Sequence, residues 1–351
     1  MLAAETKAVS LQDVEATPQE THPTWRQIVE PVDPFLHAVA KRLAEQVNEF
    51  EPEIAGYARY ALTSQGKQLR PALVALSAEA TGGPNENLVT VAAIIEMVHL
   101  ATLVHDDILD EAEVRRRRPT LAAQCGNSIS VLLGDCLFAH AVTLASGFPT
   151  PDICRAVASA TKTVCSGEIL QTQRQRQFGM TRDEYFRVLR MKTAELFALS
   201  CDLGAWLSGA TVAERGAMRA YGMALGTAYQ VYDDCLDLFG TEDVAGKSLG
   251  TDLMCGKPTL PVIVALERAS APDRRLLEEM VTHWEPIRLA PLLQLLDQYQ
   301  ALPESRKVIH EFCRSARQTL AGLPMSDGRR ALAGIAAFLA QQTDTLGIRL
   351  S

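Results

Sequence analysis

The 351-residue sequence lacks the features that mark several protein classes. Its eight cysteines contain no CxxC pair and follow no regular spacing, which argues against a zinc site or a disulfide framework and favours free thiols in a reducing compartment. A basic excess is also missing, because the formal net charge is −8, and this argues against a nucleic-acid-binding or anionic-membrane surface. We therefore expect a cytoplasmic protein that binds no nucleic acid.

A secretory signal of ordinary form and a membrane span are missing as well. The first residues include Glu5 and Asp13 and no apolar core segment. The most apolar stretch, residues 88–104, contains Glu96 and His99 and leads into acidic residues, so it is too short and too polar to cross a bilayer. We interpret it as a buried helix and expect no transmembrane segment.

Long runs of alternating β-branched residues are scarce, which argues against sheets. Apolar residues instead recur at intervals of three and four, as at Leu36, Val39 and Leu43, and glycine and proline cluster between such segments. The hydrophobic content of 47% is enough for one large domain. The predicted fold is therefore all-α, a single-domain helical bundle around a central cavity over residues 35–351. Residues 1–34 are predicted to be an N-terminal tail or docked arm.

The sequence does contain one acidic pattern twice, Asp106-Asp107-Ile108-Leu109-Asp110 and Asp233-Asp234-Cys235-Leu236-Asp237, each after an apolar helical run. Residues four apart project from one helix face, so each pattern presents paired carboxylates. Either pattern alone could be a solvated helix face. Two patterns that both follow buried runs indicate a cavity, where uncompensated carboxylates are costly and a cation would relieve their repulsion. Mg²⁺ suits such a site, because a few carboxylates and substrate phosphates usually hold it.

These motifs and others resemble those of the trans-isoprenyl diphosphate synthases, a family of all-helical, Mg²⁺-dependent prenyltransferases with two DDxxD motifs. Besides the acidic motifs, the matching segments are Gly66-Lys67-Gln68-Leu69-Arg70-Pro71, Glu96-Met97-Val98-His99, Arg115-Arg116 with Pro119-Thr120, Gly134-Asp135, Lys192-Thr193, Gln230, and Gly246-Lys247 through Gly256-Lys257. The sequence departs from the family pattern at Gln65 and Gln68, where a glycine and an arginine are common, and at Arg117, where a small residue is common.

The resemblance implies a role for each group of residues. Asp106, Asp110 and Asp233 would bind three Mg²⁺ ions together with an allylic diphosphate, with Asp107, Asp234 and Asp237 beside them. Arg115, Lys192, Lys247 and Lys257 would contact the allylic diphosphate, and Lys67, Arg70, His99 and Arg116 would hold isopentenyl diphosphate. Lys192, Thr193 and Gln230 would be the catalytic residues, with Thr193 and Gln230 stabilising a carbocation. A homodimer is also implied.

The resemblance further implies a reaction in three steps: ionisation of the allylic diphosphate, attack by the isopentenyl double bond, and loss of a proton. In the family, bulky aromatic residues one turn before the first acidic motif stop synthesis at short products. Ala101 and Thr102 occupy these positions here. Their small side chains predict that the product is a trans-polyprenyl diphosphate of thirty to fifty carbons.

Three alternatives stay open. The product could be shorter, as for a geranylgeranyl or farnesyl diphosphate synthase. A class I terpene cyclase shares the first acidic motif, but its second metal motif differs from residues 233–237, and it has no second diphosphate for Lys67, Arg70 and His99 to bind. A non-catalytic subunit of a heteromeric synthase usually loses acids from the motifs, whereas all six aspartates are present here.

Overall fold

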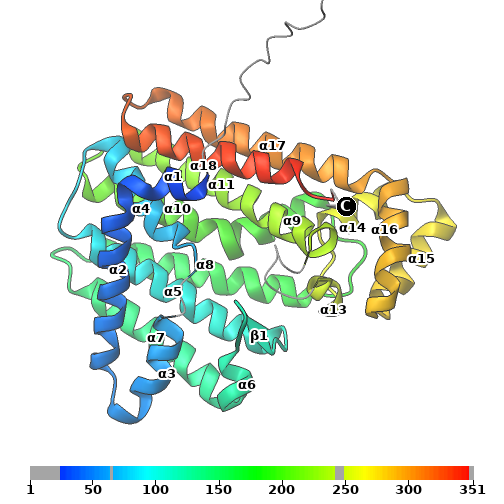
Figure 1. Cartoon of the computed structure of the whole chain (residues 1–351), viewed down its shortest axis with the longest axis horizontal. Helices are drawn as coiled ribbons and strands as arrows, with labels where there is room; N and C mark the ends of the chain where they lie inside the picture. Colours follow the sequence, from blue (N-terminus) through cyan, green and yellow to red (C-terminus); the bar gives the residue numbers. More distant parts are fainter. Residues whose placement is uncertain (1–23, 64–65, 242–248, 348–351) are drawn as a thin grey trace, which may run out of the picture.

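The structure is a computed structural model that describes residues 24–63, 66–241 and 249–347. This part of the chain is all-α, which confirms the predicted fold class. Its only sheet is a hairpin of two short strands, β1 Val114–Arg115 and β2 Arg118–Pro119. The long helices lie roughly side by side along the long axis of the molecule, with α2 and α3 at one end and α15 and α16 at the other (Figure 1).

The elements follow one another in the chain with short connections. The first half forms α1 Trp25–Val29, η1 Glu30–Val32, α2 Asp33–Gln46, η2 Val47–Glu49, α3 Pro52–Leu62, α4 Leu69–Thr81, α5 Leu88–Leu109, α6 Leu121–Cys125, α7 Asn127–Ser146 and α8 Asp152–Gln173. The second half forms α9 Arg182–Leu189, the π-helix η3 Arg190–Ala194, α10 Glu195–Leu207, α11 Val212–Phe239, α13 Thr251–Met254, α14 Leu260–Arg268, α15 Ala271–Thr282, η4 Pro286–Arg288, α16 Leu289–Gln298, α17 Ala301–Thr319, η5 Leu320–Gly322 and α18 Asp327–Asp344.

The N-terminal segment of the described chain is helical from Trp25 onward. The side chains of Ile28, Val29 and Val32 are at most 5% exposed and belong to the hydrophobic core. The rings of Trp25 and Phe338 lie 6.4 Å apart, so α1 packs against α18. Residues 25–34 therefore dock on the helical body, and residues 1–23 lie outside the described part of the chain.

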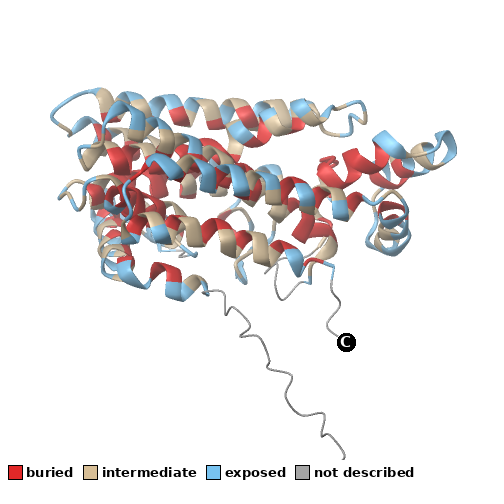
Figure 2. Ribbon diagram, turned by 90° about the horizontal axis from the view of Figure 1, so that it is seen from above, coloured by how far each residue is buried: buried red, intermediate tan, exposed pale blue. Residues whose placement is uncertain are grey.

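The buried residues concentrate on the inner faces of α4, α5, α10 and α11, and the outer helices are exposed on one side (Figure 2). Two described helices, α5 and α7, are long and apolar enough to cross a membrane by length and composition alone. In α5, 67% of the most apolar window is buried, which agrees with the prediction of a buried helix over residues 88–104. The corresponding share in α7 is 33%, and this helix leaves Ile129, Val131 and Leu132 exposed.

Close contact between α10 and α11 depends on glycine. A Cβ atom on Gly222 of α11 would lie 2.5 Å from the carbonyl oxygen of Phe197 and 2.7 Å from Cα of Ala198. These neighbours are backbone atoms of a packed helix, so they cannot move aside cheaply. Gly216, on the same helix, would meet no atom within 4 Å.

This difference predicts opposite effects of two glycine-to-alanine substitutions. Gly222→Ala is expected to lower the free energy of unfolding by about 1–3 kcal/mol, because overpacking forces α10 and α11 apart. Gly216→Ala is expected to raise it by about 0.5–1 kcal/mol, since alanine restricts the unfolded chain at an open helix position. Urea-induced unfolding followed by circular dichroism measures both. Equal stability of the two variants would contradict the packing argument.

Candidate active site

The first acidic motif lies at the C-terminal end of α5. Asp106 and Asp107 belong to the last turn, and Asp110 is the residue that caps the helix. The backbone N–H of Asp110 donates to the carbonyl oxygen of Asp106 at 2.8 Å. The helical register therefore extends to Asp110, and the side chains of Asp106 and Asp110 project from one face, as their spacing predicts.

The second acidic motif occupies the last two turns of α11. Asp233 is half-buried, whereas Asp234 and Asp237 are at most 4% exposed. Asp234 accepts hydrogen bonds from the Tyr185 hydroxyl at 2.5 Å and from Nε2 of Gln230 at 2.8 Å. The oxygens of this aspartate are therefore committed to protein donors, and Asp233 is the most accessible acid of the motif.

Lys192 lies beside the first motif, on the π-helix η3. Its Nζ is 2.5 Å from Oε2 of Glu168 and donates a hydrogen bond to Oε1 of Gln171 at 2.8 Å. Burial lowers the pKa of Lys192, but the carboxylates of Asp106 and Glu168 outweigh it, so the pKa is raised and the ammonium stays charged. Two side chains of α8 thus hold a permanent cation next to Asp106.

The next residue in the chain, Thr193, faces the second motif. Its hydroxyl donates to Oε1 of Gln230 at 2.8 Å, and Gln230 lies one helical turn before Asp234. Because Lys192 and Thr193 are consecutive, both acidic motifs lie near the same short segment. The structure therefore brings together two clusters that are more than 120 residues apart in the sequence.

Lys192 and Thr193 both belong to the π-helical turn η3. A π turn contains more residues than an α turn, is rare, and occurs frequently at functional sites. A Cβ atom on Gly167 of α8 would lie 2.7 Å from the backbone nitrogen of Lys192, so the absence of a side chain there lets α8 approach η3. Glu168 and Gln171 follow on α8, within reach of the Lys192 ammonium.

A second lysine joins the two motifs from the segment that follows α11. Nζ of Lys257 is 2.5 Å from Oδ1 of Asp110. The same segment folds back on Asp237, which accepts a hydrogen bond from the Thr251 hydroxyl at 2.7 Å and one from the backbone N–H of Asp252 at 3.1 Å. Burial lowers the pKa of Lys257, but Asp110 and Asp252 outweigh it, so the pKa is raised and the side chain remains cationic.

Negative charge is only partly compensated at Asp106. Burial raises the pKa of its carboxyl to about 6, and the neighbouring carboxylates of Glu168 and Asp110 act in the same direction against Lys192. No group of three or more His, Cys, Asp and Glu within the described residues is placed to hold an ion by itself. Such a site fits Mg²⁺, which takes only a few protein carboxylates and completes its shell with water and phosphate oxygens.

The arginine run after the first motif forms the β1–β2 hairpin. Arg115 on β1 forms an ion pair with Asp107. The two-residue turn is made by Arg116 and Arg117, with φ angles of +52° and +60°, a left-handed conformation that is unfavourable for residues with a side chain. A Cβ atom on Gly66 would lie 2.5 Å from Nη2 of Arg116, so this guanidinium packs on the backbone before α4.

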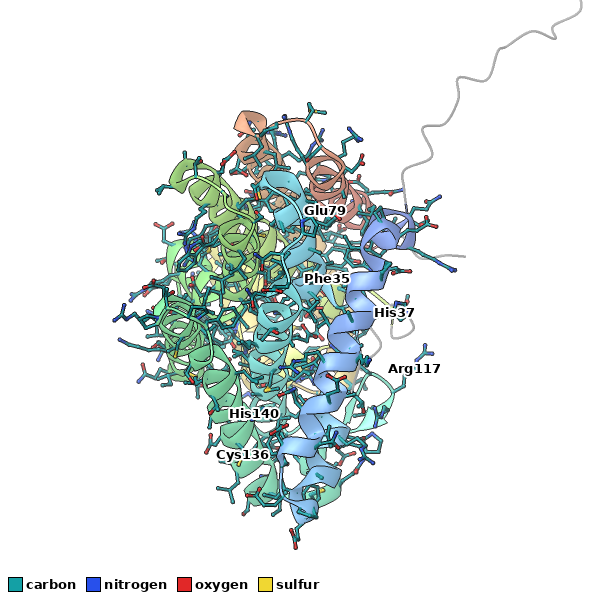
Figure 3. All side chains as sticks on the ribbon, turned by 90° about the vertical axis from the view of Figure 1, so that its left-hand side faces the viewer. Phe35, His37, Glu79, Arg117, Cys136 and His140 are labelled. Carbon is teal, nitrogen blue, oxygen red and sulfur yellow. The ribbon has the colours of Figure 1, made fainter. Side chains whose placement is uncertain are left out.

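The hairpin separates the four arginines into two pairs. Arg115 pairs with Asp107 and Arg116 packs beside Gly66, so both face the body of the protein. Arg117 is exposed and points away from the body (Figure 3). The guanidinium carbon of Arg118 lies 4.2 Å from the ring centroid of Tyr60, a cation–π contact at the surface. Only the first pair is placed to contact a ligand beside the first acidic motif.

A second cationic cluster lies around the N-terminal end of α4. Arg70 and Arg116 both interact electrostatically with the buried carboxylate of Glu96 and with His99. Burial, followed by the charges of Arg70 and Arg116, lowers the pKa of His99 well below its usual value, so this imidazole is neutral. Lys67 is exposed and follows Gly66 directly. The four residues predicted to hold isopentenyl diphosphate thus lie in one region.

The structure describes two of the three remaining predicted site residues. Ala101 is completely buried in α5, and the hydroxyl of Thr102 donates to the carbonyl oxygen of His99 at 2.7 Å. Lys247, predicted to contact the allylic diphosphate, lies outside the described residues.

Sequence reasoning missed four polar residues at the site. Glu168 and Gln171 are three apart, a spacing that places them on one helix face, yet nothing local pointed to Lys192 as their partner. Glu96 belongs to a matching segment but had no predicted role. No sequence pattern indicated a role for Tyr185, because a single tyrosine is common in helical segments.

The chain was compared with known proteins. A family model described as polyprenyl synthetase matches residues 51–288. The short chain isoprenyl diphosphate synthase of Methanothermobacter thermautotrophicus is 33% identical over 307 residues, which cover 86% of this chain and 94% of that protein. The octaprenyl diphosphate synthase of Escherichia coli is 32% identical over 308 residues, which cover 88% of this chain and 95% of that protein.

The fold has close counterparts among solved structures. The polyprenyl synthase of Caulobacter crescentus, complexed with calcium and isoprenyl diphosphate, superimposes with a TM-score of 0.86 at 29% identity. The match covers 92% of this chain and 99% of that one. Family model, relatives and fold agree, and the chain belongs to the polyprenyl synthetase family of prenyltransferases.

Proposed function

We propose that the chain condenses isopentenyl diphosphate with an allylic diphosphate and releases a trans-polyprenyl diphosphate of thirty to fifty carbons. The observation that supports this most directly is the position of Lys192 and Thr193. One holds a cation beside the first acidic cluster, and the other is hydrogen-bonded to Gln230 before the second. An anionic leaving group and a developing cation would be stabilised by neighbouring residues of a single helical segment.

We assign the binding of up to three Mg²⁺ ions to Asp106, Asp110 and Asp233. When bound, Mg²⁺ would neutralise the diphosphate and favour its departure. The other three aspartates would support these ligands, because each is already bound to protein groups. Asp107 pairs with Arg115, Asp234 accepts hydrogen bonds from Tyr185 and Gln230, and Asp237 accepts hydrogen bonds from residues 251 and 252.

The basic residues would bind the allylic diphosphate and receive its charge. Arg115, Lys192 and Lys257 already hold their charges next to the acidic motifs, so no reorganisation is needed as the C–O bond breaks and its electron pair moves to the diphosphate. Lys247 would complete this set. The oxygens of Thr193 and Gln230 would stabilise the allylic cation by their dipoles.

The second cationic cluster would hold isopentenyl diphosphate without a metal. Arg70 and Arg116 present planar forks suited to phosphate oxygens, and Lys67 adds a mobile charge. The neutral imidazole of His99 would offer one hydrogen-bond donor without adding repulsion among the arginines. The double bond of this substrate would attack the allylic cation, and the proton lost afterwards would go to the released diphosphate.

The choice of product length rests on Ala101 and Thr102. Similarity alone does not select a length, because one relative is named a short chain synthase and another an octaprenyl diphosphate synthase. Small side chains one turn before Asp106 would leave room for a growing chain to pass along α5. We therefore propose a long product, with a geranylgeranyl or farnesyl diphosphate as the alternative.

We further propose that the protein acts as a homodimer in the cytoplasm. The exposed apolar side chains of Ile129 and Leu132 on α7 support a subunit contact, because residues three apart share a helix face and exposed apolar residues favour burial against a partner. The net charge of −8 and the unpaired thiols support a reducing compartment without nucleic-acid or anionic-membrane partners.

A single assay tests the proposed reaction. The purified chain is incubated with radiolabelled isopentenyl diphosphate and dimethylallyl, geranyl, farnesyl or geranylgeranyl diphosphate, with Mg²⁺ or with excess EDTA. We expect elongated diphosphates only with Mg²⁺, and restored turnover when Mg²⁺ is added back after EDTA. The dephosphorylated alcohols are sized by chromatography.

The other outcomes identify the rival functions. Hydrocarbons from an allylic substrate alone would indicate a terpene cyclase. Absence of turnover by the purified chain would indicate a subunit that needs a different partner. Sedimentation velocity of the same sample tests the dimer, and a monomer that is fully active would contradict it.

A further inference from the structure

A chain of three hydrogen bonds leads from the protein core to the predicted catalytic pair. The hydroxyl of Tyr185 donates to Oδ2 of Asp234 at 2.5 Å. Oδ1 of Asp234 accepts a hydrogen bond from Nε2 of Gln230 at 2.8 Å. Oε1 of Gln230 accepts one from the hydroxyl of Thr193 at 2.8 Å. This series of hydrogen bonds begins on α9, passes through α11 and ends on η3.

The direction of each bond in this chain is fixed by Asp234. A carboxylate can only accept hydrogen bonds, so the Gln230 amide must turn its NH₂ group towards Asp234 and its carbonyl oxygen towards Thr193. Thr193 then uses its single hydroxyl proton on Gln230, and the lone pairs of its oxygen face elsewhere. A hydroxyl held in this way is suited to stabilise positive charge, because its oxygen and not its proton is presented.

Tyr185 is placed to hold Asp234 in that position. Its side chain is 3% exposed, and its ring packs edge-to-face on Phe186 with centroids 5.2 Å apart. Asp234 is 4% exposed, so no bulk water is available to replace a lost donor. Hydrogen bonds to an ionised acceptor are about twice as strong as neutral ones. Removal of the phenol oxygen would therefore take one hydrogen-bond donor from a buried carboxylate, and the orientation that this carboxylate gives to the Gln230 amide would be less well fixed.

We infer that Tyr185 is a positioning residue for the prenyl transfer reaction, which acts through Asp234 and Gln230 to orient the Thr193 hydroxyl towards the allylic carbon. This inference rests on the proposed function. Tyr185 is 3% exposed and reaches the site through its hydrogen bond to Asp234, so its effect is expected on the rate of the chemical step rather than on binding. The plain alternative is that Tyr185 is a core residue whose hydroxyl contributes only to stability.

The chain offers a matched control for that alternative. Tyr221 on α11 is 0% exposed, belongs to the same hydrophobic cluster, and donates its hydroxyl proton to the backbone carbonyl of Leu332 at 2.6 Å. Both tyrosines are therefore buried and hydrogen-bonded, but only the partner of Tyr185 leads to the site. If loss of a buried hydroxyl group affected activity only through stability, Tyr185→Phe and Tyr221→Phe would lower activity to a similar extent.

Steady-state kinetics of the full-length Mg²⁺-loaded enzyme test the inference. Tyr185→Phe is expected to lower kcat by about 10- to 100-fold, with KM for both diphosphates within about twofold of the wild type. Tyr221→Phe is expected to leave kcat unchanged. A fall in kcat shared by both variants, or none in Tyr185→Phe, would overturn the positioning role.

A double substitution tests whether the effect passes through Thr193. Thr193→Val removes the oxygen at the end of the hydrogen-bond chain, so adding Tyr185→Phe should cost no further activity. Losses that multiply in the double variant would show that Tyr185 acts by another route and would overturn the inference. The proposed function fails separately, because in that case the wild-type chain itself would yield no elongated diphosphate.

Discussion

Replacing Asp106 by asparagine is expected to lower turnover by about 10³-fold or more while the helical circular dichroism signal stays unchanged. The carboxylate is partly buried, and burial, together with the neighbouring acids Glu168 and Asp110, raises its pKa to about 6, so its negative charge is poorly compensated by the protein. A bound cation would supply that compensation and bring the diphosphate with it. The amide keeps the shape of the side chain but loses the charge that attracts the ion.

Asp233→Asn is expected to have an effect of the same size, because this half-buried acid is the accessible member of the second motif. Asp152→Asn is the control: Asp152 lies in the first turn of α8, its side chain is 48% exposed, and it forms a surface ion pair with Arg155 at 3.3 Å. Turnover is measured at saturating substrates and Mg²⁺. Unfolding of Asp106→Asn or Asp233→Asn, instead of loss of turnover alone, would mean that these acids are structural.

Ala101→Phe is expected to shorten the product to about fifteen to twenty carbons, with little change in the rate of the first condensation. Ala101 is 0% exposed on α5, about one turn before Asp106. A phenyl ring in this position would project along the proposed path of the chain and stop elongation, as the family resemblance implies. Chromatography of the dephosphorylated alcohols measures the shift.

A graded series at the same position provides the internal control. Ala101→Val and Ala101→Leu add less volume than Ala101→Phe. The mean product length is therefore expected to fall from the wild type through Ala101→Val and Ala101→Leu to Ala101→Phe. Overpacking of a buried position costs about 1–3 kcal/mol, and thermal unfolding of each variant separates this effect from the change in product. An unchanged product length in all three folded variants would contradict the assignment of Ala101 and Thr102.

Much of the fold could be predicted from the sequence because helices depend on local patterns. Apolar residues at three- and four-residue intervals predicted the all-α class. The apolar stretch interrupted by Glu96 and His99 predicted a buried helix, and α5 is one. The N-terminal segment was predicted to be a tail or a docked arm, and the burial of Ile28 and Val29 shows that its described part packs on the core.

The composition of the site was only partly predictable. The spacing of Asp106 and Asp110 is a property of one helix, and the matching motifs named the cations around them. The sequence did not show that Lys257 would pair with Asp110, 147 positions away, or that α8 would hold Lys192. The resemblance gave a role to Arg116 and none to Arg117, but only the hairpin turn shows that Arg116 packs beside Gly66 and that Arg117 is exposed.

The sequence by itself determined the helices, the two acidic motifs and the family to which the chain belongs. Only the tertiary structure decided that Tyr185 hydrogen-bonds to Asp234, that Glu168 and Gln171 hold Lys192, and that both motifs lie near η3. The physical reason is that helical periodicity repeats within a few residues of one segment. Pairing of side chains from different helices depends instead on how those helices pack. Packing is set by close contacts such as that of Gly167 of α8 with η3 and that of Gly222 of α11 with α10.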